Sequence, residues 1–368
     1  MNVLEQTAAV LARTVLARTV ELARIPGPTG CEQERAALVR SWWEHDGRRA
    51  HSDGVGNVWA QAGGGDGPGL LVCAHLDTVF PATVAHVVIT EPGRLCGPSV
   101  GDDSIGVAAL PALASLVRPE AGPGPVWLVA TVGEEGTGNL AGITHALAHA
   151  PRPVAAVVAI EGNYLGRVVV TGVGSVRWRV RYHGPGGHAW ERSQAPSAVH
   201  AAARACARLA GLAVAGARCS VNVGTIGGGE AINARAREAW FEVDLRADRA
   251  PALASLVEQA EAIVRAADDQ ISVDIDELGS RPAGGIGESS PLVRAAVTAH
   301  ERAGVPVEVR AASTDANAAY AAGIPAVALG VTRGEGEHTP AEWIETAPVA
   351  GGLIMLAETI AAFREGQQ

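Results

Sequence analysis

The chain repeats one arrangement: a short, almost wholly apolar segment, then a polar side chain, then a helical pattern. In LLVCAHLDTVFP, residues 70–73 lead into His75 and Asp77. Gly69 before this run and Pro81 after it mark the ends of a buried strand. Because alternate residues of a strand face the same side, His75 and Asp77 are predicted to project together at its carboxyl end. A histidine beside a carboxylate is typical of a metal ligand oriented by a second acid, although a chance pairing is the plainer explanation.

Acidic residues follow the later apolar segments in the same way. The run 125–132 is followed by Glu134 and Glu135, and the run 154–160 is followed by Glu161. Capping of a helix would explain one acid, but not a pair of glutamates directly after a strand. Because the carboxyl ends of parallel strands share one edge of a sheet, where ligands bind, we expect these carboxylates to lie together.

Two more candidates come from loops. Asp102, followed by Asp103, opens an Ala/Leu-rich helix, where helix capping is a plausible alternative. His338 follows the apolar run 326–330, so it can return to the same sheet edge. Strands that alternate with helices and are apolar on both faces indicate an α/β fold, with a mostly parallel sheet flanked by helices.

The pattern changes between residues 173 and 283. Residues 174–182 alternate apolar and basic side chains, which predicts a strand with one wet face. The elements that follow give the order strand, helix, strand, strand, helix, strand, which is typical of a ferredoxin-like α+β sandwich. We therefore expect one domain over residues 1–172 and 284–368, interrupted by an inserted domain over residues 173–283.

The composition excludes several classes of protein. The formal net charge is −10 and no run of Lys or Arg stands out, which argues against a nucleic-acid partner. The sequence has neither a run of about 18 apolar residues nor a signal-peptide pattern, so we expect a cytoplasmic protein with no membrane partner. The 5 cysteines form no CxxC pair, which favours buried thiols over disulfides.

The candidate metal ligands are two imidazoles and three carboxylates: His75, Asp102, Glu135, Glu161 and His338. This donor set suits zinc, with cobalt or manganese as alternatives. Five side chains exceed one tetrahedral site, and a carboxylate can bridge. Two divalent metal ions about 3.5–4 Å apart are therefore expected. Glu134 then lies beside a ligand, where it can act as a base.

The motifs resemble those of a known family of co-catalytic zinc amide hydrolases. Its members include peptidase T, carboxypeptidase G, aminoacylase, acetylornithine deacetylase and succinyl-diaminopimelate desuccinylase. The matching segments lie in the family's order: AHLDTVFP, GPSVGDDSIG, ATVGEEGTGNLAG, AIEG, GPGGHAW and GEHTPAEWIE. The resemblance implies a di-metal catalytic domain interrupted by a smaller lid domain that often serves for dimerisation, and hence a homodimer formed through the lid.

The resemblance also implies roles for particular residues. The ligands would divide between two ions: His75 and Glu161 for one, Glu135 and His338 for the other, with Asp102 bridging both. Asp77 would orient His75, and Glu134 would be the general base and acid.

Three residues of the inserted domain resemble groups that contact the substrate. His188 matches a histidine that reaches the substrate carbonyl or the developing oxyanion, often from the partner subunit. Asn233 and Arg246 match lid residues that bind the substrate. A solvated histidine in a glycine-rich turn is the simpler explanation for His188.

The chain departs from the family pattern at two positions, and its substrate stays open. Ser104 stands where many members have Lys, which predicts an effect on substrate or packing rather than lost metal. At the position of Glu161, glutamate is commoner in deacylases and carboxypeptidases, and aspartate is commoner in aminopeptidases. By contrast, the segments GVGS and GPGGHAW resemble the peptidase T branch. The substrate is therefore a small di- or tripeptide or, alternatively, an N-acyl amino acid.

A protein of another class, a non-catalytic or cofactor-binding doubly wound protein, is the competing hypothesis. It would require a glycine-rich turn between a strand and a helix. The glycine run 227–229 lies between two predicted strands, which does not favour a dinucleotide site.

Overall fold

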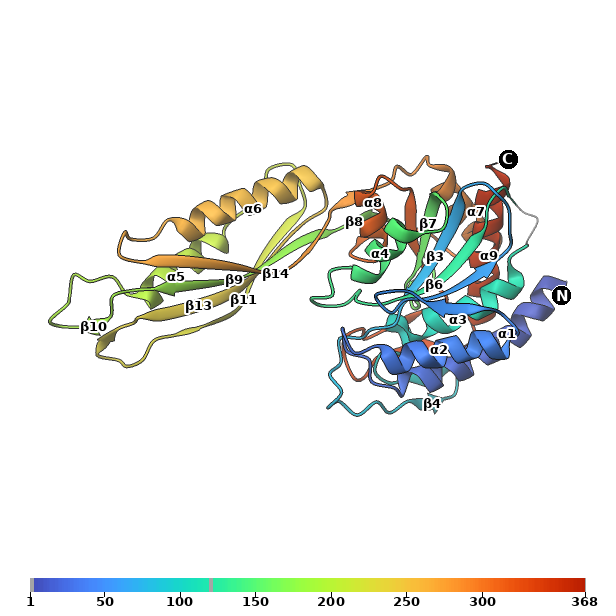
Figure 1. Cartoon of the computed structure of the whole chain (residues 1–368), viewed down its shortest axis with the longest axis horizontal. Coiled ribbons are helices and arrows are strands. Elements are labelled where there is room, and N and C mark those ends of the chain that lie inside the picture. Colours follow the sequence, from blue (N-terminus) through green and yellow to red (C-terminus); the bar gives the residue numbers. More distant parts are fainter. Residues whose placement is uncertain (1–2, 119–121, 368) are drawn as a thin grey trace. The chain divides into compact units, whose positions relative to one another are not determined.

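The computed structural model describes residues 3–118 and 122–367 and divides the chain into two compact units (Figure 1). Unit 1 comprises Met1–Gly172 and Gly285–Gln368, and unit 2 comprises Val173–Gly284. Each unit has its own hydrophobic core and is described by itself.

Over its described residues, unit 1 is built on a mixed sheet of nine strands. The strand order is β1, β2, β6, β3, β7, β17, β8 and β15, with β16 beside β8. Strands β6, β3, β7 and β17 are parallel neighbours, whereas β2 is antiparallel to β6. The predicted α/β fold is confirmed, with antiparallel strands added towards the edges of a parallel centre. The strands are β1 Ala50–Ser52, β2 Val58–Ala62, β3 Gly69–His75, β6 Val126–Thr131, β7 Val154–Ile160, β8 Arg167–Gly172, β15 Gly284–Gly285, β16 Glu308–Ala312 and β17 Ala326–Leu329.

Helices cover both faces of this sheet (Figure 1). On one face α3 packs on β3 and β6, and α7 packs on β8 and β17, with α1 and α9 packed outside them. On the other face α8 packs on β7 and β17, with α4 beside it. The central strands are buried on both faces, which explains their continuous apolar sequences. The helices are α1 Val3–Ala23, α2 Gln33–His45, α3 Ile105–Leu116, α4 Ala141–His149, α7 Pro291–Arg302, α8 Ala316–Ala321 and α9 Val349–Glu365.

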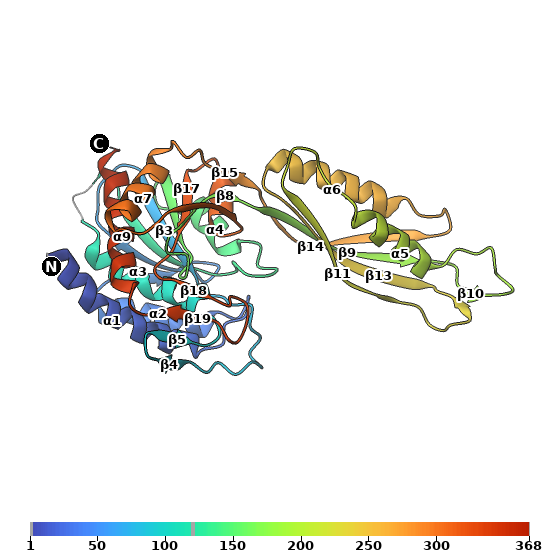
Figure 2. The same ribbon diagram turned by 180° about the vertical axis from the view of Figure 1, so that it is seen from behind.

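A small second sheet in unit 1 joins two segments that lie far apart in the sequence (Figure 2). Its order is β18, β19, β5, β4. Strand β19 pairs with β5, so the loop after β18 is brought beside the π-helical turn η1 that follows β5. The elements are β4 Ile89–Glu91, β5 Arg94–Cys96, η1 Val100–Ser104, β18 Gly334–Glu335 and β19 Trp343–Glu345.

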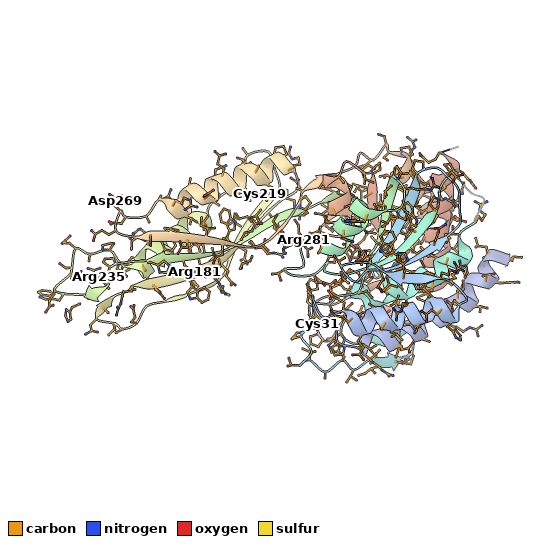
Figure 3. All side chains as sticks on the ribbon, in the orientation of Figure 1. Cys31, Arg181, Cys219, Arg235, Asp269 and Arg281 are labelled. Carbon is orange, nitrogen blue, oxygen red and sulfur yellow. The ribbon has the colours of Figure 1, made fainter. Side chains whose placement is uncertain are left out.

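Unit 2 is an antiparallel sheet in the order β11, β13, β9, β14, with α5 and α6 packed on it. Along β9 the side chains alternate: Trp178, Val180 and Tyr182 enter the core, while Arg179 and Arg181 remain partly exposed. Figure 3 shows Arg181 on this strand. Apart from the two-residue strands β10 and β12, which were not expected, the elements occur in the order predicted from the sequence. They are β9 Gly174–His183, β10 Gly187–His188, α5 Ala198–Leu209, β11 Cys219–Gly228, β12 Ala234–Arg235, β13 Glu238–Ala247, α6 Ala250–Arg265 and β14 Ser272–Arg281.

Some details differ from the sequence-based expectation. The strand expected over 305–309 lies over Glu308–Ala312, and strand β8 was not expected. All five cysteines are free thiols, of which only Cys73 is fully buried and Cys31 is exposed. In the part of the chain that the structure describes, no helix has the length and apolarity needed to cross a membrane.

Candidate metal centre

The candidate ligands of unit 1 meet at the carboxyl edge of the parallel strands. His75 is the last residue of β3, Glu134 and Glu135 lie in the loop after β6, and Glu161 directly follows β7. Asp102 lies in η1, and His338 lies in the loop between β18 and β19. All but Asp102 and His338 are buried, with at most 8% of each residue exposed.

Asp102 lies between the two histidines and contacts one with each oxygen. His75 Nε2 is 2.9 Å from Asp102 Oδ1, and His338 Nε2 is 3.1 Å from Asp102 Oδ2. His338 Nε2 is also 3.4 Å from Glu135 Oε1. One carboxylate that faces two imidazoles has the geometry of a bridging ligand.

Two groups of three side chains could each hold a metal ion. One is His75, Asp102 and Glu161, the other is Asp102, Glu135 and His338, and in each group the ligand atoms lie within 4.8 Å of one another. A third grouping, His75 with Glu134 and Glu135, also meets this criterion.

The residues present fit divalent cations. Imidazole and carboxylate are the donors that zinc, cobalt and manganese take in proteins. Glu135 Oε1 is buried, and its contact with the His338 imidazole is long, at 3.4 Å. A buried carboxylate oxygen is costly unless it is paired or coordinates a metal.

The titration behaviour shows how closely these charges are packed. Hydrogen bonds to Asp102 and Glu135 raise the pKa of His338 to about 10. Burial lowers the pKa of His75, but its hydrogen bonds with Asp102 and Asp77 outweigh burial, and the net pKa is well above the usual range. Burial raises the pKa of Glu161 well above the usual range, and the negative charges of nearby acids raise it further. Binding of cations by these groups would therefore compete with binding of protons.

Asp77 supports more than the His75 side chain. Its Oδ1 lies 3.6 Å from His75 Nδ1, while its backbone carbonyl is closer to the same nitrogen, at 3.0 Å. Its carboxylate accepts N–H bonds from Glu134 at 2.9 Å and Glu135 at 2.8 Å, and a hydroxyl bond from Thr29 at 2.8 Å. Asp77 thus fixes the backbone of the two glutamates as well as the imidazole.

A comparison with family models places the chain. Residues 71–362 match the model described as peptidase family M20/M25/M40. The chain belongs to peptidase family M20/M25/M40. It is accordingly a metal-dependent hydrolase, and the carboxylate and histidine cluster of unit 1 agrees with this family membership.

Solved structures of M20 relatives share the fold over nearly the whole chain. Aminopeptidase PepT from Bacillus cereus ATCC 10987 is 20% identical, with a TM-score of 0.80 over 96% of this chain and 98% of that chain. A tripeptidase (SAV1512) from Staphylococcus aureus subsp. aureus Mu50 is 22% identical, with a TM-score of 0.79 over 97% of this chain and 98% of that chain. YXEP from Bacillus subtilis, described as a dinuclear metal binding peptidase, is 19% identical, with a TM-score of 0.71 over 97% of this chain and 99% of that chain. No curated protein sequence matches.

Two further acids, which the sequence did not single out, hold the M20 site together. Asp103 is buried and accepts N–H bonds from Gly162 at 2.9 Å and His75 at 3.2 Å. Glu342 is also buried, and its Oε1 accepts N–H bonds from Gly101 at 2.7 Å and Asp102 at 2.8 Å. Burial and then the charge of Asp102 raise the pKa of Glu342 to about 9. The adjacent pair of aspartates was the available signal for Asp103.

Ser104, the position at which the chain departs from many M20 members, contacts a buried arginine. The Nη2 of Arg35, from α2, donates to the Ser104 hydroxyl at 2.6 Å. Arg35 is completely buried, and its Nε and Nη1 have no hydrogen-bond partner among the described residues. Burial lowers the pKa of Arg35 to about 10, against the charges of Asp77 and Asp103 among other acids. No local signal in the sequence pointed to Arg35.

The three site residues expected from the inserted domain all lie in unit 2. His188 and Asn233 come together at a short ribbon, where β10 pairs with β12 and the Ala189 N–H donates to the Asn233 carbonyl at 2.8 Å. Arg246 lies near the other end of β13, opposite Ser175, and its Nε and Nη2 donate to Asp244. His188 and Asn233 thus lie together in unit 2, whereas Arg246 lies elsewhere in this unit.

Proposed function

We propose that this M20 hydrolase cleaves an amide bond in a small peptide, a di- or tripeptide, by attack of an activated water. The observation that carries the proposal is the pair of ligand groups that share Asp102, with Glu134 beside them. PepT, an aminopeptidase, and the S. aureus tripeptidase share this fold, which supports a peptide substrate.

The proposed roles of the side chains follow from the geometry. His75 and Glu161 would hold one divalent cation, Glu135 and His338 the other, and Asp102 both; zinc suits this donor set, with cobalt or manganese as alternatives. Two such cations would supply a water of near-neutral pKa and polarise the scissile carbonyl. Glu134 takes a proton from the attacking water and returns it to the leaving amine. Asp77 keeps the Glu134 backbone in place for both transfers.

The substitution Glu134→Gln tests this proposal. It keeps the size of the side chain and removes its basicity, so we expect kcat to fall by about 10²- to 10⁴-fold while the metal content is unchanged. Metal content is measured by elemental analysis, and turnover is measured with dipeptide substrates. Glu301→Gln, on the exposed surface of α7, is the matched control. Near-normal turnover of Glu134→Gln with metal bound would refute the role of Glu134.

Hydrolysis of N-acyl amino acids is the second candidate function. The residue after β7 is Glu161, which the family resemblance associates with deacylases more than with aminopeptidases. Both reactions cut an amide by the same proton transfers. A panel of dipeptides against N-acetyl and N-succinyl amino acids separates the two candidates.

We further propose that residues 1–172 and 284–368 are the catalytic domain and that residues 173–283 are a lid and dimerisation domain. His188 would donate to the substrate carbonyl as negative charge develops, with Asn233 contacting the substrate. Strand β11 is an unpaired edge of the unit 2 sheet, within the described residues, and carries the exposed Ile226. Such an edge supports pairing with a second copy of this chain.

For His188→Ala we expect a large loss of kcat with full metal content, because His188 is proposed to act on the substrate and not on the metals. Turnover and metal content are measured on the same preparation. A loss of metal would make His188 a ligand and contradict this role.

A further inference from the structure

A hollow of about 270 Å³ opens on the surface of unit 1, and Tyr164 in its lining lies three residues after Glu161 along the chain. Its polar lining residues are Tyr164, Arg167 and Arg310, and Val169, Ala311 and Ala312 form the rest. No carboxylate is among the described residues that line it. All three polar lining groups can donate hydrogen bonds, and two of them are permanently charged.

The chain path ties this hollow to two of the candidate ligands. The Tyr164 N–H donates to the carbonyl of Glu161 at 2.9 Å, and the Arg167 N–H donates to the carbonyl of Tyr164 at 2.8 Å. Arg167 Nη1 also lies 3.7 Å from Glu337 Oε1, and Glu337 directly precedes His338.

The three donor groups are available to a ligand. The Arg167 side chain is 38% exposed, its guanidinium lies 4.9 Å from the centroid of the Tyr164 ring, and its contact with Glu337 is long, at 3.7 Å. Tyr164 is half-buried at the wall of the hollow. Arg310 is paired with Glu308 at 2.8 Å, but both side chains are more than half exposed. Exposed ion pairs contribute little free energy, so Arg310 can exchange Glu308 for another carboxylate at small cost.

We propose that this hollow is a carboxylate-binding subsite, so that the enzyme prefers substrates carrying an anionic group on the part that lies beside Glu161. The proposal rests on the proposed function and names its substrate class: peptides or N-acyl amino acids with an acidic residue. Arginine matches a carboxylate with two parallel N–H bonds, which gives both affinity and orientation. Arg246, which the family resemblance implies as a substrate-binding residue, already uses Nε and Nη2 on Asp244.

The substitution Arg310→Gln tests the subsite with isosteric pairs of substrates. The pairs are Ala-Glu with Ala-Gln and N-acetylglutamate with N-acetylglutamine, which differ in charge but hardly in size. For the wild type we expect a higher kcat/KM on the acidic member. In Arg310→Gln we expect this preference to fall by about 10- to 100-fold, mainly through KM, because a charge-assisted hydrogen bond is lost.

Two further variants and one control sharpen the test. Arg167→Gln should reduce the same preference, and Tyr164→Phe should reduce it less, since only a neutral donor is lost. Arg302→Gln removes a guanidinium that lines a different hollow of unit 1 and should leave the preference unchanged. Equal activity of the wild type on both members of each pair, or an unaltered preference in both arginine variants, would overturn the subsite.

A binding measurement separates this proposal from the proposed function. N-acetylglutamate and N-acetylglutamine are titrated by calorimetry into the metal-free protein, in which no turnover is expected. Weaker binding of N-acetylglutamate by Arg310→Gln than by the wild type supports the subsite, and equal binding contradicts it. If no substrate of the panel is cleaved but this difference remains, the proposed reaction fails and the subsite stands.

Discussion

The two units use charged side chains in opposite ways. In unit 1, Arg35, Asp77 and Asp103 are completely buried beneath the metal centre. In unit 2, Arg179 pairs with Glu242 across neighbouring strands and Arg181 pairs with Asp276, on a face where each side chain is about a third to a half exposed. In unit 1 the charges lie where water screens them little. In unit 2 the charges lie on the polar face of a sheet whose other face forms the apolar core.

The buried charges of unit 1 lie around the candidate metal centre, whereas the charges of unit 2 lie on a partly exposed face of a sheet. A buried ion pair costs much desolvation, and breaking it leaves one charge uncompensated. An exposed pair contributes little, because water and salt screen it. We therefore expect substitutions of charged residues in unit 1 to be severe and those in unit 2 to be mild.

The largest expected effect is that of Asp102→Asn. Because Asp102 contacts both histidines, its loss should weaken both cation sites at once. We expect activity to fall by more than 100-fold, beyond the about 10- to 100-fold typical of residues that only orient a ligand. Elemental analysis should show less metal than in the wild type. Full metal content would contradict a bridging role for Asp102.

The next effect is that of Arg35→Met on the protein without metal. Removing a buried guanidinium leaves the nearby carboxylates uncompensated, and we expect a loss of about 3–5 kcal/mol in the free energy of unfolding. Bound cations supply positive charge to the same cluster, so the loss should be smaller in the metal-loaded protein. Denaturant unfolding with and without chelator measures both values.

A charge placed at the neighbouring position provides the control. In the wild type, the Arg35 guanidinium contacts the Ser104 side chain. In the double variant Arg35→Met with Ser104→Lys, the lysine ammonium group can therefore occupy the space of the lost guanidinium. We expect it to restore part of the stability of the metal-free protein. If the metal-free and metal-loaded forms lose the same amount, and the lysine restores nothing, Arg35 acts through packing alone.

The smallest effect is expected in unit 2. Glu242→Gln removes the partner of Arg179 on an exposed sheet face, and we expect a change below about 1 kcal/mol in the free energy of unfolding and none in metal content. Thermal unfolding of the metal-loaded protein measures it. A loss as large as that of Arg35→Met would remove the contrast between the two units.

The sequence allowed the strand-end part of the site to be predicted, because His75, Glu135 and Glu161 each follow an apolar run. His338 and Asp102 lie in loops, and the structure shows that the pairing of β19 with β5 brings them together. That pairing has no local signature, since both strands have only three residues. Arg35 was missed for a similar reason, since its contact with Ser104 spans 69 positions of the chain.

One error in the fold concerns a strand at the edge of the sheet. Strand β16 was expected over 305–309, which are more apolar, but the paired residues are 308–312. This strand is largely exposed, so burial does not shape its sequence. The two central strands β3 and β7, buried on both faces through most of their length, were predicted closely.

The order of the ligands along the chain has a consequence for synthesis. Four of them, from His75 to Glu161, precede unit 2, and the fifth, His338, follows it. A growing polypeptide therefore completes unit 2 while one of the two cation sites still lacks its imidazole. Nearly the whole chain must therefore have left the ribosome before the second proposed cation site is complete.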